Sequence, residues 1–427
     1  MKSLSAISMV LVTLAVPIGV AGTEVAPQSN AEVRFGPKLV IDIKAKSLVG
    51  PSVQLDDNNV IHVAWVEEDQ NERKVRYTHT SDSVGAFASP LSVNGPDEIA
   101  YSRQEAPAIA VHGQQIYLAW AKMHPQTSAE KPLANELRLS RSPDGGKTFL
   151  PSVLINDDGL AIVHSFDSLR IGHEEALHVA WIDAREGKKN PGTYVSRSND
   201  QGMTFSKNTK IDDETCVCCR TAVAVAPDGT VYTAWRKIFG DVKETVVARS
   251  LDGGMTFSAP VIVGHDHWAY PSCPHRPASL GVDRDGRLYV VWYTEGEDET
   301  PAVYLAYSDD RGQTFSSKRM LNSSRGTFPD HPQLAVDSRG RVVALWEELS
   351  PVRREVVMSY SLDRGRTFSA PQKVNEKKGE SPSIAANSTG QIVLAWKEHA
   401  MPAHRLVIQG IELPDRPTLA QRAEEPR

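Results

Sequence analysis

The sequence predicts an all-β, seven-bladed β-propeller, and three periodic features carry this prediction. A box of the form Ser-x-Asp-x-Gly-x-Thr-Phe recurs five times along the chain. A strand that ends in Trp recurs in phase with this box. An apolar strand near the N-terminus has no repeat of its own and is therefore available to complete the last one. Four strands repeated at a period of roughly 50–60 residues are typical of propeller blades.

The boxes predict tight turns between neighbouring strands. Their Asp and Ser side chains can hydrogen-bond to backbone N–H groups of the same turn, their Gly accepts a positive φ, and their Phe can pack between sheets. We therefore interpret the five box aspartates as structural. The copies are SPDGGKTF at 142–149, SNDQGMTF at 198–205, SLDGGMTF at 250–257, SDDRGQTF at 308–315 and SLDRGRTF at 361–368, with a degenerate copy, TSDSVGAF, at 80–87.

The strands that end in Trp set the number of blades. Each unit reads as strand, tight turn, Trp-containing strand, loop, third strand, box and fourth strand. The last unit lacks the box and the fourth strand. The segment KLVIDIKAK at 38–46 can supply that strand by pairing with 405–413, which closes the ring and removes exposed sheet edges. A six-bladed ring of the sialidase type is the alternative. The seven tryptophans are Trp65, Trp120, Trp181, Trp235, Trp292, Trp346 and Trp396.

The repeat resembles the Asp-box, or BNR, repeat of the sialidase-like propellers over about residues 40–413. The resemblance is specific for the fold and poor for the function. Asp-box propellers include sialidases, other glycosidases, sorting receptors and photosystem assembly factors. What the resemblance implies is therefore the architecture, and the function has to be argued from the loops.

The ends of the chain indicate export. Residues 1–22 contain a Lys, a short apolar run and then small residues, which is typical of a secretory signal peptide. We expect an N-terminal segment at 23–37, one propeller domain at 38–413 and a disordered polar tail at 414–427. The expected location is the periplasm or the medium, where disulfides persist. No other stretch predicts a membrane span, the net charge of −6 argues against nucleic acid, and we expect a monomer.

Propeller geometry predicts which loops form a binding face. The loops that lead into the innermost strand of each blade crowd one mouth of the central channel, and binding residues concentrate on loops held by a rigid scaffold. These loops are rich in Arg, Asp, Glu and His side chains. The candidate ligand-binding residues among them are Arg103, Glu105, Asp167, Arg220, Arg276 and Asp330.

The stretch DDETCVCCRTAVAV at 212–225 holds three of the four cysteines of the chain. An exported chain with an even cysteine count predicts disulfides, in any of three pairings. Thiolates beside imidazoles suit a soft metal instead, copper ahead of zinc. One disulfide together with a Cys/His metal pair also fits the count. The candidate metal ligands are Cys216, Cys218, Cys219, Cys273, His275 and His331.

The resemblance also implies a hydrolase as an alternative. Sialidases bind a substrate carboxylate with three arginines and use a Tyr nucleophile activated by Glu, with an Asp acid/base. The N-terminal Arg-Ile-Pro motif of the family is absent here. Arg220 and Arg353 lie roughly where the second and third arginines would be, and Asp183 in WIDAREG is a candidate acid. No Tyr/Glu pair can be assigned from the sequence.

The leading functional hypothesis is binding at the channel mouth. The ligand is either a metal ion, with copper favoured over zinc, or a partner in an envelope assembly process. The partner would be a small ligand, a glycan or an envelope protein. The alternative is a sialidase-like exo-glycoside hydrolase that acts on glycans.

Overall fold

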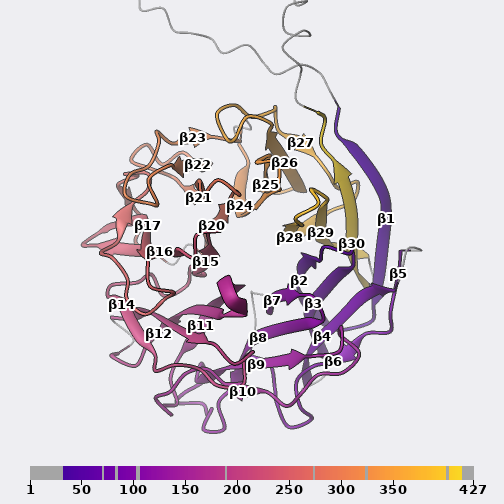
Figure 1. The fold of residues 1–427 in the computed structure, drawn as a ribbon, viewed down its shortest axis with the longest axis vertical. Coiled ribbons are helices and arrows are strands. Elements are labelled where there is room, and N and C mark those ends of the chain that lie inside the picture. The colour runs from indigo at the N-terminus through magenta and orange to yellow at the C-terminus, as the bar shows by residue number, and fades with distance from the viewer. Residues whose placement is uncertain are drawn as a thin grey trace, which may run out of the picture.

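The computed structural model is a closed ring of seven β-sheets around a central channel (Figure 1). It describes residues 32–69, 72–81, 85–101, 106–187, 190–272, 275–322, 326–400 and 403–415. The predicted signal peptide and most of the predicted polar tail lie outside these residues. The prediction of a seven-bladed propeller is confirmed, and the six-bladed alternative is wrong.

Each blade is an antiparallel sheet, and blades are numbered here by their innermost strands in chain order. The innermost strands are β2 (Ser47–Leu55), β7 (Ala108–His112), β11 (His164–Ile171), β15 (Ala222–Val225), β20 (Ser279–Val282), β24 (Phe328–Val336) and β28 (Gly379–Ala386). The Trp-containing strands are β3 (Ile61–Asp69), β8 (Gln115–Met123), β12 (Leu177–Asp183), β16 (Val231–Phe239), β21 (Leu288–Thr294), β25 (Val342–Leu349) and β29 (Ile392–Ala400).

The third strands are β4 (Glu72–Ser81), β9 (Asn135–Ser142), β13 (Gly192–Ser198), β17 (Val242–Ser250), β22 (Ala302–Ser308), β26 (Arg354–Ser361) and β30 (Ala403–Glu412). The outer strands are short and comprise β6 (Leu91–Ser92), β10 (Val153–Leu154), β14 (Thr209–Asp212), β18 (Val261–Ile262), β23 (Arg319–Met320) and β27 (Gln372–Lys373). Two further pieces, β5 (Ala86–Phe87) and β19 (Trp268–Ala269), and one 3₁₀ turn, η2 (His173–Glu175), complete the described elements.

The N-terminal strand closes the ring, as predicted. β1 (Arg34–Ile43) pairs antiparallel with β30, from Arg34 opposite Glu412 to Ile43 opposite His404. In Figure 1 this pairing appears as the indigo strand beside the yellow one. The strand begins at Arg34 and not at residue 38, because a register irregularity between Phe35 and Lys38 accommodates the Gly-Pro pair at 36–37. Blade 7 is thus built from both ends of the chain.

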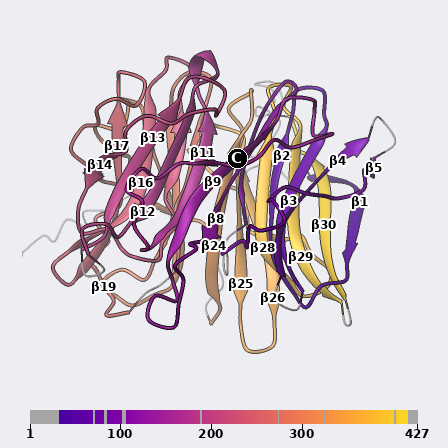
Figure 2. The same ribbon diagram turned by 90° about the horizontal axis from the view of Figure 1, so that it is seen from below.

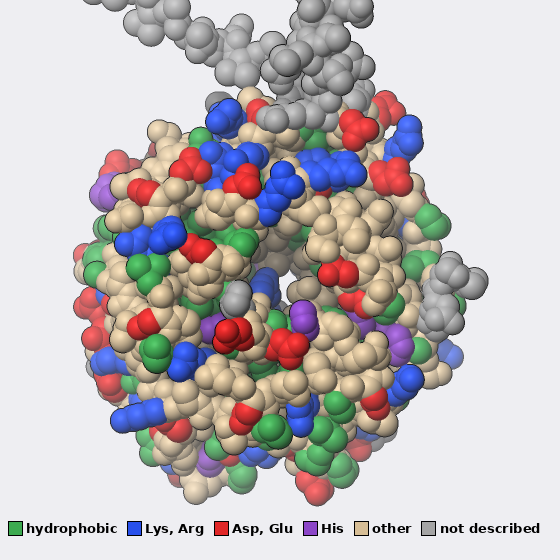
Figure 3. Space-filling model, viewed as in Figure 1, with side chains coloured by type: hydrophobic (Ala, Val, Ile, Leu, Met, Phe, Trp, Pro, Cys, Tyr) green, Lys and Arg blue, Asp and Glu red, His purple; other side chains and the backbone are tan. Residues whose placement is uncertain are grey.

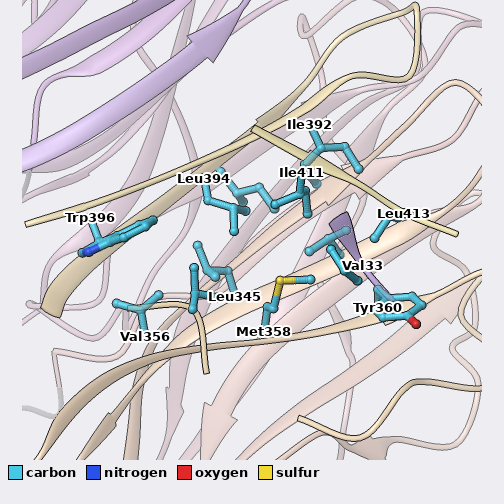
Figure 4. Packing of buried hydrophobic residues seen from close by; sticks show 14 of the residues in the cluster. Val33, Leu345, Val356, Met358, Tyr360, Ile392, Leu394, Trp396, Ile411 and Leu413 are labelled. Carbon is cyan, nitrogen blue, oxygen red and sulfur yellow. The ribbon is translucent and has the colours of Figure 1, made fainter. Parts of the chain in front are cut away.

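Apolar side chains between neighbouring sheets form the core. Figure 4 shows the layer between blades 6 and 7, where Leu345 and Met358 of one sheet pack with Leu394 and Trp396 of the other. The blade tryptophans are nearly inaccessible, and most of them donate the indole N–H to a carboxylate. Trp346, for example, bonds to Glu348 Oε1 at 2.8 Å. The repeated Trp therefore anchors the layer between blades and also satisfies its own polar group.

The Asp-boxes are turn anchors, as the sequence indicated. In blade 4 the Ser250 hydroxyl donates to Asp252 Oδ1 at 2.7 Å and accepts the N–H of Gly254 at 2.7 Å. The Thr256 hydroxyl donates to Asp252 Oδ2 at 2.6 Å. The bonds from Thr256 and Ser250 hold the pKa of Asp252 far below its usual range. Equivalent Ser and Thr hydroxyl bonds recur at Asp144, Asp200, Asp310 and Asp363.

The two faces of the ring carry different loops. Boxes and the turns after the innermost strands lie on one face, and the loops that enter the innermost strands lie on the other, the mouth face. Figure 2 shows the ring from the side, with the β25–β26 hairpin projecting from one face. In Figure 3 the molecule is hollowed at its centre, and Lys and Arg side chains gather near the chain ends. Among the described residues no helix has the length and apolar character of a membrane span.

Candidate functional site

The cysteine-rich loop is fixed between blades 3 and 4 at the mouth. It runs from β14 to β15 and is held by backbone bonds on both sides. The N–H of Cys216 donates to Arg236 O at 2.8 Å, and the N–H of Thr221 donates to Phe166 O at 3.1 Å. Phe166 has a positive φ of 62° at a register shift in β11, which turns the backbone of that strand toward the loop. The loop is therefore an ordered part of the scaffold.

Three sulfur atoms converge in this loop. Cys216 Sγ lies 3.8 Å from Cys218 Sγ and 3.9 Å from Cys219 Sγ. All three side chains are buried, and Phe166 and Ile238 pack against them. Cys216 and Cys219 carry free thiols. Cys273 lies outside the described residues, so its approach to the other three and the predicted pairing stay predictions.

Buried cations surround the sulfur atoms. The Arg236 side chain is 2 % exposed; its Nη2 donates to Tyr293 O at 2.7 Å, while its Nε and Nη1 have no hydrogen-bond partner among the described residues. Contact with the Cys219 thiol, together with the charges of Arg236 and Lys243, lowers the pKa of Cys216. Burial raises the pKa of Cys219. The loop can therefore hold one thiolate beside one protonated thiol.

The predicted histidine ligands differ in their surroundings. Burial and the neighbouring Arg276 lower the pKa of His275 by more than its contact with the backbone of Cys218 raises it, so a neutral ring is favoured beside the loop. His331 Nδ1 lies 2.9 Å from Asp330 Oδ1 and 3.7 Å from Glu347 Oε1. Burial alone would lower the pKa of His331, but these carboxylates raise it to about 9. A neutral imidazole can bind a metal and a protonated one cannot, so His275 is the better candidate.

The charge on His331 predicts a pH-dependent stability. Its folded pKa lies above that of an unfolded His, ~6.5, so its stabilising contribution is complete below that pH and is lost as the pH rises through about 9. We expect the melting temperature of the wild type to fall more between pH 6.5 and 9.5 than that of His331→Gln. Parallel melting profiles for the two proteins would contradict the assignment of the charge to His331.

The predicted ligand-binding residues form two groups. Arg220 Nε donates to Asp167 O at 2.5 Å, and Asp167 is buried, with an Oδ2 atom that meets no hydrogen-bond partner in the part of the chain that the structure describes. Burial raises the pKa of Asp167. Arg276 Nη1 pairs with Asp330 Oδ2 at 2.9 Å. The structure therefore joins four of the six predicted residues in two pairs at the mouth. Arg103 and Glu105 lie outside the described residues.

The residues considered for a hydrolase lie in less suitable places. Arg353 is exposed in the loop between β25 and β26. Asp183 is fully buried and accepts the indole N–H of Trp181 and the Arg185 guanidinium, each at 2.9 Å. The structure also contains a Tyr–Glu contact that the sequence did not reveal: Tyr293 Oη donates to Glu295 Oε1 at 2.6 Å. Burial and Glu295 raise the pKa of Tyr293, which disfavours a phenolate nucleophile.

Sequence reasoning missed a row of buried polar groups behind the mouth. They occupy one position of the repeat, directly after the blade tryptophan. That position is apolar in blades 1–3 and polar in blades 4–7. This change within the repeat could have been noticed in the sequence. In blades 4–7 the position holds Arg236, Tyr293, Glu347 and Lys397, all of them buried.

Comparison with known proteins agrees with this architecture. Residues 222–419 match the model of the BNR repeat-like domain family. The chain is a seven-bladed β-propeller whose C-terminal half is similar to the BNR repeat-like domain. A stretch of 96 residues of this propeller is 35% identical to yeast (Saccharomyces cerevisiae) invertase 1, which covers 22% of this chain and 16% of the invertase. The propeller thus spans about a sixth of the curated relatives that it matches.

Solved structures share the fold of this BNR-repeat propeller at low sequence identity. An ulvan lyase of polysaccharide lyase family PL25, solved with a -[GlcA(1-4)Rha3S]- ligand, has a TM-score of 0.56 at 10% identity, with 91% of this chain and 100% of that chain covered. The Hadza microbial sialidase Hz136 has a TM-score of 0.49 at 14% identity, with 71% and 64% covered. At 10% identity the likeness to the ulvan lyase concerns the fold alone, and no conclusion is drawn from the likeness to the sialidase.

Proposed function

We propose that this propeller is an exported protein, periplasmic or secreted, that binds a soft metal ion at its mouth, with copper(I) favoured. The observation that carries the proposal is the pair of free, buried thiols of Cys216 and Cys219, 3.9 Å apart. Free thiols held this close in an exported chain need a reason to stay reduced, because disulfides are the default state in that compartment. A bound metal supplies such a reason.

The spacing of the thiols suits a metal. Two thiolates on one ion with metal–sulfur bonds of ~2.3 Å lie about 3.8 Å apart in a tetrahedral arrangement and about 4.0 Å apart in a trigonal one. The separation of Cys216 Sγ and Cys219 Sγ, 3.9 Å, suits a three-coordinate ion without any movement of the loop. Of the predicted ligand set, we assign Cys218 to the one disulfide of the mixed disulfide-and-metal alternative, and His331 is held by carboxylates. The site therefore reduces to Cys216 and Cys219, with neutral His275 as a third candidate.

The charge and softness of the site favour copper(I) over zinc. Soft thiolate ligands select copper(I), whereas a structural zinc site has four protein ligands. The described residues offer two free thiols and one neutral imidazole here, and copper(I) accepts two or three ligands. Arg236 and Lys243 offset the negative charge of the thiolates. Burial of the sulfur atoms limits access of oxidants.

The alternative, a sialidase-like hydrolase acting on glycans, has less support. It requires an activated tyrosine, an acidic group open to substrate and a cluster of arginines. Tyr293 has a raised pKa, Asp183 is fully buried, and Arg353 is exposed at a hairpin. The polysaccharide bound by the PL25 ulvan lyase supports only the possibility of a glycan partner on this fold. No described contact favours an envelope protein as the partner.

A copper titration tests the metal proposal. The mature protein, kept anaerobic, should take about one copper(I) per chain in competition with bicinchoninate, as expected for one thiolate pair. Cys216→Ser and Cys219→Ser should each abolish this binding while the propeller still melts cooperatively. The double variant Cys218→Ser/Cys273→Ser keeps the free pair and should bind copper as the wild type does. Equal binding by wild type and Cys219→Ser, or none by wild type with two titratable thiols, would refute the proposal.

A further inference from the structure

We propose that Arg236 and Lys243 form a charge filter that makes the proposed metal site select monovalent over divalent soft ions. The inference rests on the proposed function, because it concerns the ion held by Cys216 and Cys219. Ligand softness alone leaves zinc(II) as a competitor of copper(I), since thiolates and imidazoles bind zinc as well. The charge around the ligands is a second determinant of which ion binds.

Strand geometry places both cations on the sulfur side of blade 4. Ile238 of β16 packs against the three buried cysteine side chains. Successive side chains of a strand point to opposite faces, so Arg236, two residues earlier, shares the face of Ile238. Lys243 of β17 lies directly opposite Ile238 in the antiparallel pairing, and the side chains of such a pair lie on the same face. In agreement with this placement, the charges of Arg236 and Lys243 both act on Cys216.

Both cations are buried and held in place. The guanidinium of Arg236 donates to Tyr293 O at 2.7 Å, and its carbon lies 4.9 Å from the centroid of the Trp268 ring. Lys243 is 7 % exposed, and its Nζ donates to Tyr270 O at 2.7 Å. The hydrogen-bond acceptors of both cations are backbone oxygens, and neither cation pairs with a carboxylate among the described residues. Two buried positive charges therefore face the sulfur atoms without a carboxylate to offset them.

Two further cations near the loop are paired with carboxylates. Arg276 Nη1 lies 2.9 Å from Asp330 Oδ2. Lys237 points to the face of β16 opposite to Arg236, where its Nζ donates to Asp212 Oδ1 at 2.7 Å. These pairs add little net charge to the surroundings of the sulfur atoms, so the excess of positive charge there comes from Arg236 and Lys243.

The charge of the ion decides how well such a site accepts it. Any metal that binds Cys216 and Cys219 displaces the same thiol protons, so the protonation of the sulfur atoms does not distinguish one metal from another. Zinc(II) leaves one unit of positive charge more beside the two cations than copper(I) does. In a buried site, where water screens charges poorly, this extra charge is repelled by both cations. Arg236 and Lys243 therefore weaken zinc binding more than copper binding.

The ratio of two affinities tests the charge filter. Metal-free mature protein is titrated anaerobically at one pH, with copper(I) against bicinchoninate and with zinc(II) against the dye zincon. In Arg236→Met the ratio of zinc(II) to copper(I) affinity should rise at least about tenfold above that of the wild type, because one repulsive charge is lost. Arg236→Lys keeps the cation, and its ratio should stay within about threefold of the wild type. A purely structural role of Arg236 would weaken both metals alike and leave the ratio unchanged.

Two further variants keep the test decisive. Lys243→Met should raise the ratio in the same direction, which covers the case that Arg236→Met folds poorly. Lys237→Met is the matched control, because it removes a cation from the opposite face of β16, and its ratio should stay within about twofold of the wild type. Ratios in Arg236→Met and Lys243→Met no higher than in Lys237→Met would overturn the charge filter and leave copper(I) binding by the wild type standing. A wild type that takes up no copper(I) would refute the proposed function, and the filter with it.

Discussion

A mature chain that begins at Lys44, without β1, should melt at least about 10 °C lower than the full mature protein and should aggregate. β1 covers β30 along its length and buries Ile41 and Ile43 in the layer between blades 7 and 1. Its loss would leave β30 as an exposed edge with unpaired backbone groups, which is a template for association with other chains. Thermal melts followed by circular dichroism and light scattering would measure both effects.

The matched control begins at Glu32 and keeps β1 whole. It should melt within about 2 °C of the full mature protein, since a small change in free energy moves the melting temperature of a large domain little. A chain beginning at Lys44 that melts as high as this control and stays monomeric would show that β1 does not stabilise the ring.

Trp346→Ala should lower the free energy of unfolding by about 3–5 kcal/mol. The side chain is completely buried between blades 5 and 6, and its indole N–H donates to Glu348 Oε1 at 2.8 Å. Truncation would therefore leave a cavity and also remove a partner from a buried carboxylate. Urea unfolding of the wild type and the variant gives the difference.

Val352→Ala is the control for this substitution. Val352 is 74% exposed at the hairpin after β25, the same strand that carries Trp346, so its truncation should change the free energy of unfolding by less than about 0.5 kcal/mol. A loss below about 1 kcal/mol for Trp346→Ala would mean that the blade tryptophans do not anchor the layers between sheets.

Most of the fold was predictable because the repeat encodes it locally. Each box fixes its own turn through Ser and Thr hydroxyl bonds, and each Trp in the second strand of a repeat marks one blade, so the seven repeated tryptophans suffice to count the blades. The start of β1 was placed four residues late, since Gly36 and Pro37 are unfavourable strand residues. Only the pairing with β30 shows that a register irregularity accommodates them.

The location of the candidate site was predictable from the sequence, whereas its chemistry was predictable only in part. Loop positions follow from propeller geometry, which brought Cys216, Cys218 and Cys219 to the mouth beside His275. Which sulfur is bonded, and which cation lies beside it, depends on side-chain packing between blades. Arg236 was overlooked because a charged residue in a strand is ordinarily expected to face solvent. The Arg236 side chain instead is buried, and its charge acts on Cys216 in the loop.

The closure of blade 7 also fixes an order of events in folding. Its outer strand, β1, comes first among the described strands, and the strand that it pairs with, β30, comes last among them. Joining the two ends of a chain segment this long costs about 5 kcal/mol of conformational entropy by simple loop-closure arithmetic. Blades 1–6 contain only consecutive strands and can form while residue 412 is still missing. We therefore expect the pairing of β1 with β30 to form after blades 1–6.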